Sequence, residues 1–577
     1  MDLYVDGVTI PLQQDPTIHR SVRNGRMSLS FRKRWYEKLI IWNKMKILRG
    51  PYSIEEAREI GIVENPTVVV EKPDGSVRPA TNCSFPKNKK KGDTRVSINE
   101  SIPEGDKKVK YTDARTITQH LDAVKRHYGV DRLYMWSADI EKAFLNLYLK
   151  RKDKRLIGLN IRGKIFILDA LPFGLAVAPK EFTRFMGYVL RIVRKRDKNL
   201  FYSEKINIKG CDVNIDVFRE DFDSFVSDKG TSIILSLIDA YVDDIYGFHI
   251  SEEQAQKQFQ LLKDTLEKVS LKLKEEKSNK PHWIGRLLGI IYDTLLEILK
   301  ACPIKVGRYI KKLQAIKAKK TVQGEELYSA VGQVRHVGGI YRCINAFARG
   351  MEAIIFTKPL AHYHNVNRRL REDIDLCIEG LISARDIGVP WKYILRPAMK
   401  GDIVIYGDAA LTSGGIGGYM KVGPWERQYI MVPWSEMNMY HSQFRDIVWR
   451  ELSVPFVWLA LLKKYQIHDV SITIYSDNEG VVGMGIKRTS SLKRPECQTM
   501  LREMCRWEMR QRWHVWYKHV PGKLNDPSDA LSREDWKRAF AAYDLSGRIS
   551  AHNELQYAIE LCKGVVPKRC DLIMTDE

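Results

Sequence analysis

Two acidic residues stand side by side in the segment LSLIDAYVDDIYGFHI, where apolar runs flank Asp243 and Asp244. Adjacent carboxylates are costly to bury without compensation, so a cation is their natural partner. Aspartate also favours tight turns for backbone reasons, and taken alone the pair fits an ordinary turn better than a metal site. A metal site therefore needs further ligands from another part of the chain.

A third aspartate could converge on this pair. Asp139 ends the strand-like run in LYMWSADIEKAFLNLYL, although an aspartate in this position more commonly caps the following helix. Phosphoryl transfer by two metal ions needs carboxylates from separate elements to hold Mg²⁺ against the attacking oxygen and a triphosphate. Asp139 and Asp243 could supply these ligands. Between them, ILDALPFGLAVAPKEFTRFM predicts a turn at 171–174 and a helix that Pro179 opens.

A second set of carboxylates is spread over the last third of the chain. Asp408 follows the strand-like IVIY, Glu451 opens the helix-like ELSVPFVWLALL, Asp477 ends SITIYSD, and Asp529 lies in PGKLNDPSDALSR. Each one could be a helix cap or a strand-end turn residue. Together they offer the ring of hard oxygen ligands that two divalent ions need to cleave a phosphodiester.

The elements that must position these residues belong to several domains. Strand-like and helix-like segments alternate between 133 and 247, the stretch 281–400 is largely helical in pattern, and a second α/β unit opens after Pro397. We therefore expect a multidomain α+β and α/β protein with these regions: a basic helical extension at 1–60, a core at 61–280 with an insertion at 191–232, a largely helical region at 281–400, an α/β domain at 401–535 and a tail at 536–577.

The charge balance indicates a partner. Lys and Arg number 94 against 71 Asp and Glu, a net charge of +23, which attracts a polyanion. Nucleic acid is the first expectation; a basic surface without function and a membrane-surface binder are the alternatives. The nine cysteines lack zinc-ligand spacing, the amino terminus lacks a secretion pattern, and no apolar stretch is long enough to cross a bilayer. We expect reduced cysteines, no membrane association, and an intracellular protein of the cytoplasm or nucleus.

Taken in order, SADIEKAF, LPFGLAVAP and YVDD resemble three successive palm motifs of retroelement reverse transcriptases. The resemblance implies a right-hand polymerase fold with fingers and palm at 61–280 and primer grip, thumb and connection at 281–400. It implies that Asp139 and Asp243 bind the catalytic Mg²⁺ ions, two per active site with Mn²⁺ as the alternative, while Asp244 supports the site. Phe144 matches the steric gate, whose ring excludes a ribose 2′-hydroxyl and so selects dNTPs.

The same resemblance implies further contacts with the nucleotide. Lys72 and Arg78 in VEKPDGSVRPA match the fingers residues that contact the incoming triphosphate, with an exposed hairpin pair as the alternative. Lys277 in LKEEKSNK matches a palm lysine that protonates the leaving pyrophosphate, and 285–292 resembles the primer-grip strand. The remaining predicted nucleotide-binding residues are Phe173, Gly174 and Tyr241.

The order D, E, D, D and the ending VPGKLNDPSDALSR resemble ribonuclease H. The resemblance implies a ribonuclease H-like α/β domain at 401–535 in which Asp408, Glu451, Asp477 and Asp529 are the catalytic metal ligands. Many members of that family carry a mobile histidine before the last aspartate. Here Lys523 takes that place, and we expect the nearby His519 to be structural.

Two more segments narrow the family. ATNCSFPKNKKKGDTRVSINESIP and ELYSAVGQVRHVGGIYRCINAFARGMEAI resemble DIRS-type retroelements, with gypsy-like LTR retrotransposons next. The resemblance implies RNA- and DNA-templated DNA synthesis and cleavage of the RNA strand of hybrids, for retroelement replication. Its partners are an RNA template, a DNA primer, an RNA/DNA hybrid and dNTPs, with a recombinase and structural proteins as candidates; the oligomeric state stays open. The alternatives are a non-catalytic RNA-binding scaffold and a viral RNA-dependent RNA polymerase, and the full set of acids and Phe144 argue against them.

Overall fold

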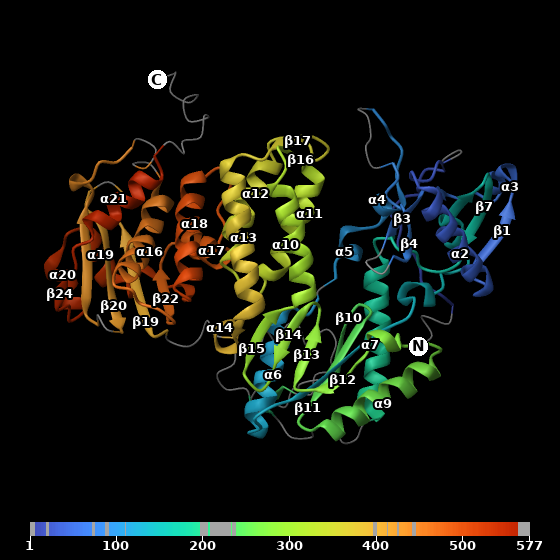
Figure 1. Ribbon diagram of the computed structural model, residues 1–577, viewed down its shortest axis with the longest axis horizontal. Coiled ribbons are helices and arrows are strands. Elements are labelled where there is room, and N and C mark those ends of the chain that lie inside the picture. The colour runs from blue at the N-terminus through green and yellow to red at the C-terminus, as the bar shows by residue number, and fades with distance from the viewer. Residues whose placement is uncertain are drawn as a thin grey trace. The chain divides into compact units, whose positions relative to one another are not determined.

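The computed structural model is a mixed α/β structure made of two compact units (Figure 1). Unit 1 comprises residues 1–209 and 213–288, and unit 2 comprises residues 210–212 and 289–577. The described residues are 6–18, 22–71, 75–86, 92–109, 111–196, 206–207, 232–233, 238–395, 401–411, 413–423, 426–440, 443 and 446–563. Most of the expected insertion at 191–232 lies outside them.

An antiparallel four-stranded sheet forms the centre of unit 1. Its strands follow the order β10 (Ile238–Tyr241), β11 (Asp244–His249), β5 (Tyr134–Asp139) and β12 (Asn279–His282). Helices α7 (Ala178–Arg196) and α9 (Glu252–Lys268) pack against this sheet. The helix α9 begins where Ser251 accepts a hydrogen bond from the Gln254 amide, and its buried Phe259, Leu262 and Leu266 recur at helical spacing.

A close crossing fixes α9 on this sheet. A side chain at Gly247 of β11 would overlap both the Trp136 ring and the Gln258 amide, so only glycine fits there. The Trp136 indole N–H donates to Gln258 Oε1 at 2.7 Å inside the core. This buried hydrogen bond joins β5, which ends in Asp139, to α9.

The described residues among the first 60 are built into unit 1. Val8 bridges to Leu149 in parallel, and Trp35 and Trp42 of α2 (Leu29–Lys44) share the core of the central sheet. The strands β3 (Thr67–Glu71) and β4 (Val77–Thr81) pair in antiparallel orientation. The other elements of unit 1 are β1 (Leu48–Tyr52), α3 (Ile54–Glu59), β2 (Glu64–Asn65), α4 (Ile98–Ser101), α5 (Glu104–Lys107), α6 (Ala114–Tyr128), η1 (Ala143–Asn146), η2 (Lys154–Leu156), β6 (Gly158–Ile161), β7 (Lys164–Leu168), β8 (Ile206–Asn207), β9 (Ser232–Ile233), η3 (Glu275–Lys277) and β13 (Ile284–Leu287).

Unit 2 begins with short strands and a group of helices. The helices α10 (Pro303–Lys317), α11 (Gly324–Gly338), α12 (Ile344–Ile355) and α13 (Arg368–Asp386) pack on one another. The segment expected to be largely helical thus carries strands as well. These are β14 (Ile290–Asp293), β15 (Ile298–Ala301), β16 (Thr321–Gln323), β17 (Tyr363–Asn365) and β18 (Val389–Pro390), and the short helix α14 (Trp391–Leu395) follows them.

A six-stranded sheet forms the rest of unit 2, in the order β23 (His514–His519), β22 (Ser471–Ser476), β19 (Ile403–Ala409), β20 (Gly415–Val422), β21 (Gln428–Pro433) and β24 (Gly547–Arg548). Side chains alternate between its two faces. A Cβ at Gly418 would meet Trp458 of α16 (Ile447–Lys464), whereas one at Gly417 would meet Leu531 of α19 (Asp526–Ser532). The helices α16 and α19 therefore cover opposite faces.

The expected tail at 536–577 belongs to this fold as far as it is described. β24 adds a parallel edge strand beside β21, and Leu555 and Ile559 of α21 (His552–Leu561) are buried in the core of the sheet. The remaining elements are η4 (Trp434–Glu436), α17 (Glu479–Lys487), α18 (Pro495–Arg510), η5 (Gly522–Leu524) and α20 (Trp536–Ala542). Among the described residues, no helix is long and apolar enough to cross a bilayer, and the seven described cysteines are buried free thiols.

Candidate active sites

Three of the predicted carboxylates meet on adjacent strands of unit 1. A two-residue turn, Val242 and Asp243, joins β10 to β11, and Asp244 lies opposite Asp139 in the pairing of β11 with β5. The Asp243 carbonyl accepts a hydrogen bond from the Ile140 amide at 3.1 Å. Asp139, Asp243 and Asp244 are called the hairpin cluster below.

The turn of this hairpin is strained. Val242 adopts φ = 58°, a left-handed conformation that β-branched residues rarely take. Such a residue costs on the order of 1–3 kcal/mol and persists only where the surrounding structure enforces it. Here the paired strands on both sides hold the turn. Strained backbone conformations are common at functional sites. The strain at Val242 therefore supports a functional role for the adjacent Asp243.

A lysine lies inside the hairpin cluster. Lys277 Nζ donates to Asp139 Oδ2 at 2.6 Å, and this hydrogen bond raises the pKa of Lys277. Burial and the neighbouring Asp139 raise the pKa of Asp243, while Arg78 and Lys277 act against that rise. Asp243 thus sits where its negative charge is disfavoured, and a cation bound beside it would relieve the cost.

The predicted aromatic residues form a packed group in unit 1. The Phe144 ring lies 5.0 Å from the Phe173 ring, and the Arg78 guanidinium lies 4.7 Å above Phe173. Gly174 holds φ = 106°, and a side chain there would overlap the Thr81 carbonyl oxygen. The Thr81 amide donates to the Phe173 carbonyl at 2.7 Å, which fastens the turn at 171–174 to β4.

The other two predicted nucleotide contacts are Tyr241 and Lys72. Tyr241 packs on Tyr111, with ring centroids 4.6 Å apart, and Tyr111 carries no motif that would have marked it in the sequence. Lys72 lies outside the described residues. Arg78, Phe144 and Phe173 are therefore the predicted nucleotide contacts that the structure brings together.

A second group of carboxylates meets in unit 2. Asp408 lies in β19, Glu451 in α16, and Asp477 directly after β22, and each offers an oxygen within 4.8 Å of the other two. These three residues are called the sheet-edge cluster below. The helix begins at Ile447, four residues before Glu451, and it contains Pro455. Because proline has no N–H, the helix makes no hydrogen bond from residue 455 to the Glu451 carbonyl.

Burial controls the charge of this cluster. Asp408 is 6% exposed and Glu451 7%, and burial with the neighbouring acids raises the pKa of Glu451 to about 9. Burial also raises the pKa of Asp408 and of Asp477. Glu451 Oε2 is buried without a hydrogen-bond partner, while Asp408 accepts a 2.6 Å hydrogen bond from Ser532 Oγ. Burying three neighbouring carboxylates is unfavourable unless a positive charge compensates them. Their oxygens are suitable ligands for a divalent cation.

The fourth predicted ligand, Asp529, is engaged by arginines. It accepts hydrogen bonds from Arg533 Nε at 2.8 Å and from Arg538 Nη2 at 2.6 Å. Burial acts to raise the pKa of Asp529, but these two hydrogen bonds lower it overall. Sequence reasoning missed both arginines. Arg533 could have been found from its i,i+4 spacing on a helix, whereas Arg538 belongs to the next helix and needed the fold.

The histidine expected to be structural is exposed. His519 ends β23 beside Asp477, and its charge acts to lower the pKa of Asp477. Lys523 is exposed in η5, whose first residue, Gly522, lies against Asp477. Both basic residues are thus at the surface on the Asp477 side of the sheet-edge cluster.

Metal-dependent phosphoryl-transfer enzymes use carboxylates to bind metal ions and nearby basic side chains to bind phosphate. The hairpin cluster, with Lys277, Arg78 and the aromatic rings, offers groups of these kinds. Residues 70–292 match the family model described as reverse transcriptase (RNA-dependent DNA polymerase). This segment, which contains the hairpin cluster, is similar to reverse transcriptase domains. A search of curated proteins gave no match.

Solved structures of foamy virus proteins are similar to the chain. The foamy viral protease-reverse transcriptase in complex with an RNA/DNA hybrid aligns with a TM-score of 0.47 at 15% identity, covering 88% of this chain and 57% of that one. The same viral protein in complex with dsDNA aligns with a TM-score of 0.44 at 15% identity, covering 89% of this chain and 87% of that one.

Proposed function

We propose that this chain is a reverse transcriptase with its own ribonuclease H. It would synthesise DNA from dNTPs on RNA and DNA templates and cleave the RNA strand of RNA/DNA hybrids. The observation that supports the proposal is the presence of two separate carboxylate clusters in one chain, the first inside the segment that matches the reverse transcriptase model and the second on a different sheet.

In the polymerase half, the residues of unit 1 bind and orient the substrates. Arg78, whose guanidinium carries a fork of N–H donors, would hold the triphosphate next to the hairpin cluster. Phe144, backed by Phe173, would block a ribose 2′-hydroxyl. Lys277 would leave Asp139 when a cation arrives and would then give its proton to the departing pyrophosphate.

In the nuclease half, Asp408, Glu451 and Asp477 would hold the scissile phosphate in place through bound cations, with Asp529 as the fourth ligand. Bound divalent ions, two Mg²⁺ per cluster or Mn²⁺ in their place, would stabilise the charge that develops on the phosphoryl group at both clusters. Ser532 orients Asp408, and the two arginines hold Asp529 to one side of the other three acids.

The origin proposed for the enzyme is a DIRS-type retroelement, with a gypsy-like LTR element as the alternative. The motifs at 80–103 and 326–354 support it. We propose that the enzyme acts in the cytoplasm or nucleus. The described cysteines are buried free thiols, as expected in a reducing compartment. The expected partners are an RNA template, a DNA primer, the hybrid that they form, and the recombinase and structural proteins of the element.

One experiment tests both halves. Primer extension on RNA and DNA templates and cleavage of an RNA/DNA hybrid are measured for the wild type, Asp243→Asn and Asp477→Asn. Exposed aspartates supply matched controls, Asp264→Asn in unit 1 and Asp544→Asn in unit 2. Asp243→Asn should lose extension and keep cleavage, and Asp477→Asn should do the reverse. If neither variant loses an activity, the two-site proposal is wrong.

A further inference from the structure

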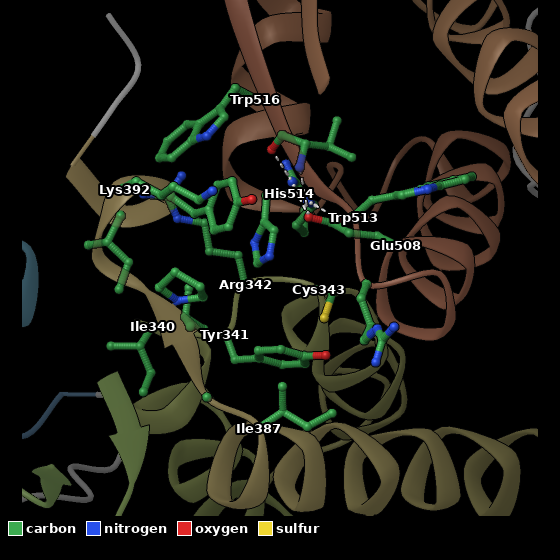
Figure 2. Close-up of a pocket in the computed structure, with 18 of the residues that line it drawn as sticks. Ile340, Tyr341, Arg342, Cys343, Ile387, Lys392, Glu508, Trp513, His514 and Trp516 are labelled. Atoms are coloured by element: carbon green, nitrogen blue, oxygen red, sulfur yellow. Dashed lines mark hydrogen bonds and ion pairs between the residues drawn. The ribbon is translucent and has the colours of Figure 1, made fainter. Parts of the chain in front are cut away.

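Unit 2 contains a cavity of about 230 Å³ (Figure 2). Most of its walls come from three stretches of chain: 339–343, which joins α11 to α12, 387–394 around β18 and α14, and 512–516 at the start of β23. Asp469, Arg488 and Glu508 complete the lining. The volume lies just below the roughly 300–1,000 Å³ of pockets for drug-sized ligands. It therefore suits a ligand smaller than a typical drug molecule.

This cavity is separate from the sheet-edge cluster. His514, at the beginning of β23, pairs with Ser471, whereas His519, at the end of the strand, pairs with Ser476 next to Asp477. Five residues of a parallel strand span about 16 Å. The cavity residue His514 thus lies at the opposite end of β23 from the carboxylates, and neither carboxylate cluster uses the residues that line the cavity.

The walls carry an excess of positive charge. Four lining residues are basic and two are acidic. Both acids are already engaged, since Glu508 pairs with Arg488 at 2.7 Å and Asp469 pairs with Arg512. Burial, followed by the charge of Lys392, lowers the pKa of His514 to about 4, so the imidazole is neutral near pH 7. The lining residues therefore carry a net charge of about two units positive, and Arg342 and Lys392 contribute to it.

Flat surfaces lie beside these two cations. The rings of Tyr393 and His514 stack with centroids 3.5 Å apart and planes within 6° of each other. The Arg342 guanidinium lies 4.5 Å over the Trp516 ring, and Lys392 Nζ lies 4.7 Å over Tyr393. In Figure 2, Trp516, Lys392, His514 and Arg342 are drawn around the same cavity. Aromatic rings and guanidinium planes are the surfaces on which nucleobases stack.

We propose that this cavity binds one nucleotide bearing a 5′-monophosphate. The phosphate, which carries about two negative charges, pairs with Arg342 and Lys392, and the base lies against the surfaces of Trp516, Tyr393 and His514. The nucleotide is either free or the unpaired 5′ end of a single strand. In the second case the cavity would hold a strand end on unit 2 away from the cutting site.

The test is isothermal titration calorimetry on the full-length chain in EDTA, which prevents metal-dependent binding at either carboxylate cluster. The ligands are AMP, adenosine, inorganic phosphate, and a trinucleotide with or without a 5′-phosphate. The variants are Lys392→Gln, whose side chain is exposed, and Arg342→Gln. Lys320→Gln, an exposed lysine of unit 2 outside the cavity lining, is the matched control.

AMP should bind one site per chain, and adenosine and inorganic phosphate should each bind at least about tenfold more weakly. Each cavity variant should weaken AMP binding by about tenfold or more, and Lys320→Gln should leave it unchanged. If the 5′-phosphorylated trinucleotide displaces AMP, the ligand is a strand end; if AMP alone binds, it is a free nucleotide.

Three results would overturn the proposal. AMP and the phosphorylated trinucleotide could both fail to bind. Inorganic phosphate could bind as tightly as AMP, which would make the cavity a plain anion site. AMP could also bind Lys392→Gln and the wild type equally, with unchanged unfolding temperatures. None of these results depends on whether the chain polymerises or cleaves, so they leave the proposed function untouched.

Discussion

The hairpin cluster and the sheet-edge cluster compensate buried negative charge in different ways. In the hairpin cluster, the ammonium of Lys277 contacts Asp139 at 2.6 Å. In the sheet-edge cluster, no ion pair reaches Asp408, Glu451 or Asp477 within the described part of the chain. A metal ion entering the first cluster must displace a lysine. One entering the second must displace protons, because the Glu451 carboxyl has a pKa of about 9.

The largest effect should come from Glu451→Gln. This change keeps the shape of the side chain but removes a charge that a metal ion needs, so hybrid cleavage should fall by about 10³-fold or more. Primer extension should stay within about twofold. The measurement is the rate of both reactions at saturating Mg²⁺. Cleavage at the wild-type rate would mean that Glu451 holds no catalytic cation.

At the hairpin cluster, Lys277→Gln should act in two opposite directions. Loss of a proton donor should slow extension by about 10²-fold or more. The Mg²⁺ concentration for half-maximal activity should fall, because the lysine no longer competes for Asp139. Rates are measured across a Mg²⁺ titration, with Lys257→Gln on the surface of α9 as the control. If rate and Mg²⁺ requirement both stay unchanged, Lys277 is only a surface ion pair.

Without bound metal, the stability of unit 2 should depend on pH through Glu451 of the sheet-edge cluster. Glu451 has a pKa of about 9 in the folded chain and about 4.5 unfolded, so its carboxyl favours the folded state below pH 4.5, and this contribution is lost as pH rises towards 9. In EDTA, the unfolding transition of unit 2 should therefore move to lower temperature between pH 6 and 9. Mg²⁺ should reverse part of the loss, most strongly at high pH.

The control for this pH series is again Glu451→Gln, which has no carboxyl to ionise. Its unfolding temperature in EDTA should change less with pH than that of the wild type, and Mg²⁺ should have little effect on it. Calorimetric scans at half-unit pH steps provide the data. An equal slope in the two proteins would place the origin of the pH effect elsewhere in unit 2.

The acids of both clusters could be read from the sequence because each lies in a local motif, a strand end or a helix turn. The features that the sequence did not predict depend on contacts between segments that are far apart in the chain. Val8 pairs with Leu149, and β24 joins the sheet beside β21, so these described residues from the first and last parts of the sequence belong to folded units. Arg538 reaches Asp529 from a separate helix, and no local pattern indicates which acid it meets. Periodicity marks an amphipathic face but not its partner.

The smallest effect should come from Val242→Gly at the turn of the hairpin. Glycine accepts φ = 58° without strain, which stabilises the folded state by about 1–3 kcal/mol, and its extra freedom in the unfolded chain offsets about 0.5–1 kcal/mol of that. Unit 1 should therefore unfold at a slightly higher temperature, while extension slows a few-fold because Asp243 is held less firmly.

The matched control is Val70→Gly in β3, an exposed strand residue with ordinary backbone angles. There the same substitution relieves nothing and should lower stability by about 0.5–1 kcal/mol. Opposite signs at positions 242 and 70 would show that the hairpin turn stores strain in support of Asp243. Destabilisation at both positions would mean that the Val242 side chain contributes more through packing than its backbone costs. Side-chain packing, and not backbone strain, would then hold the turn that carries Asp243.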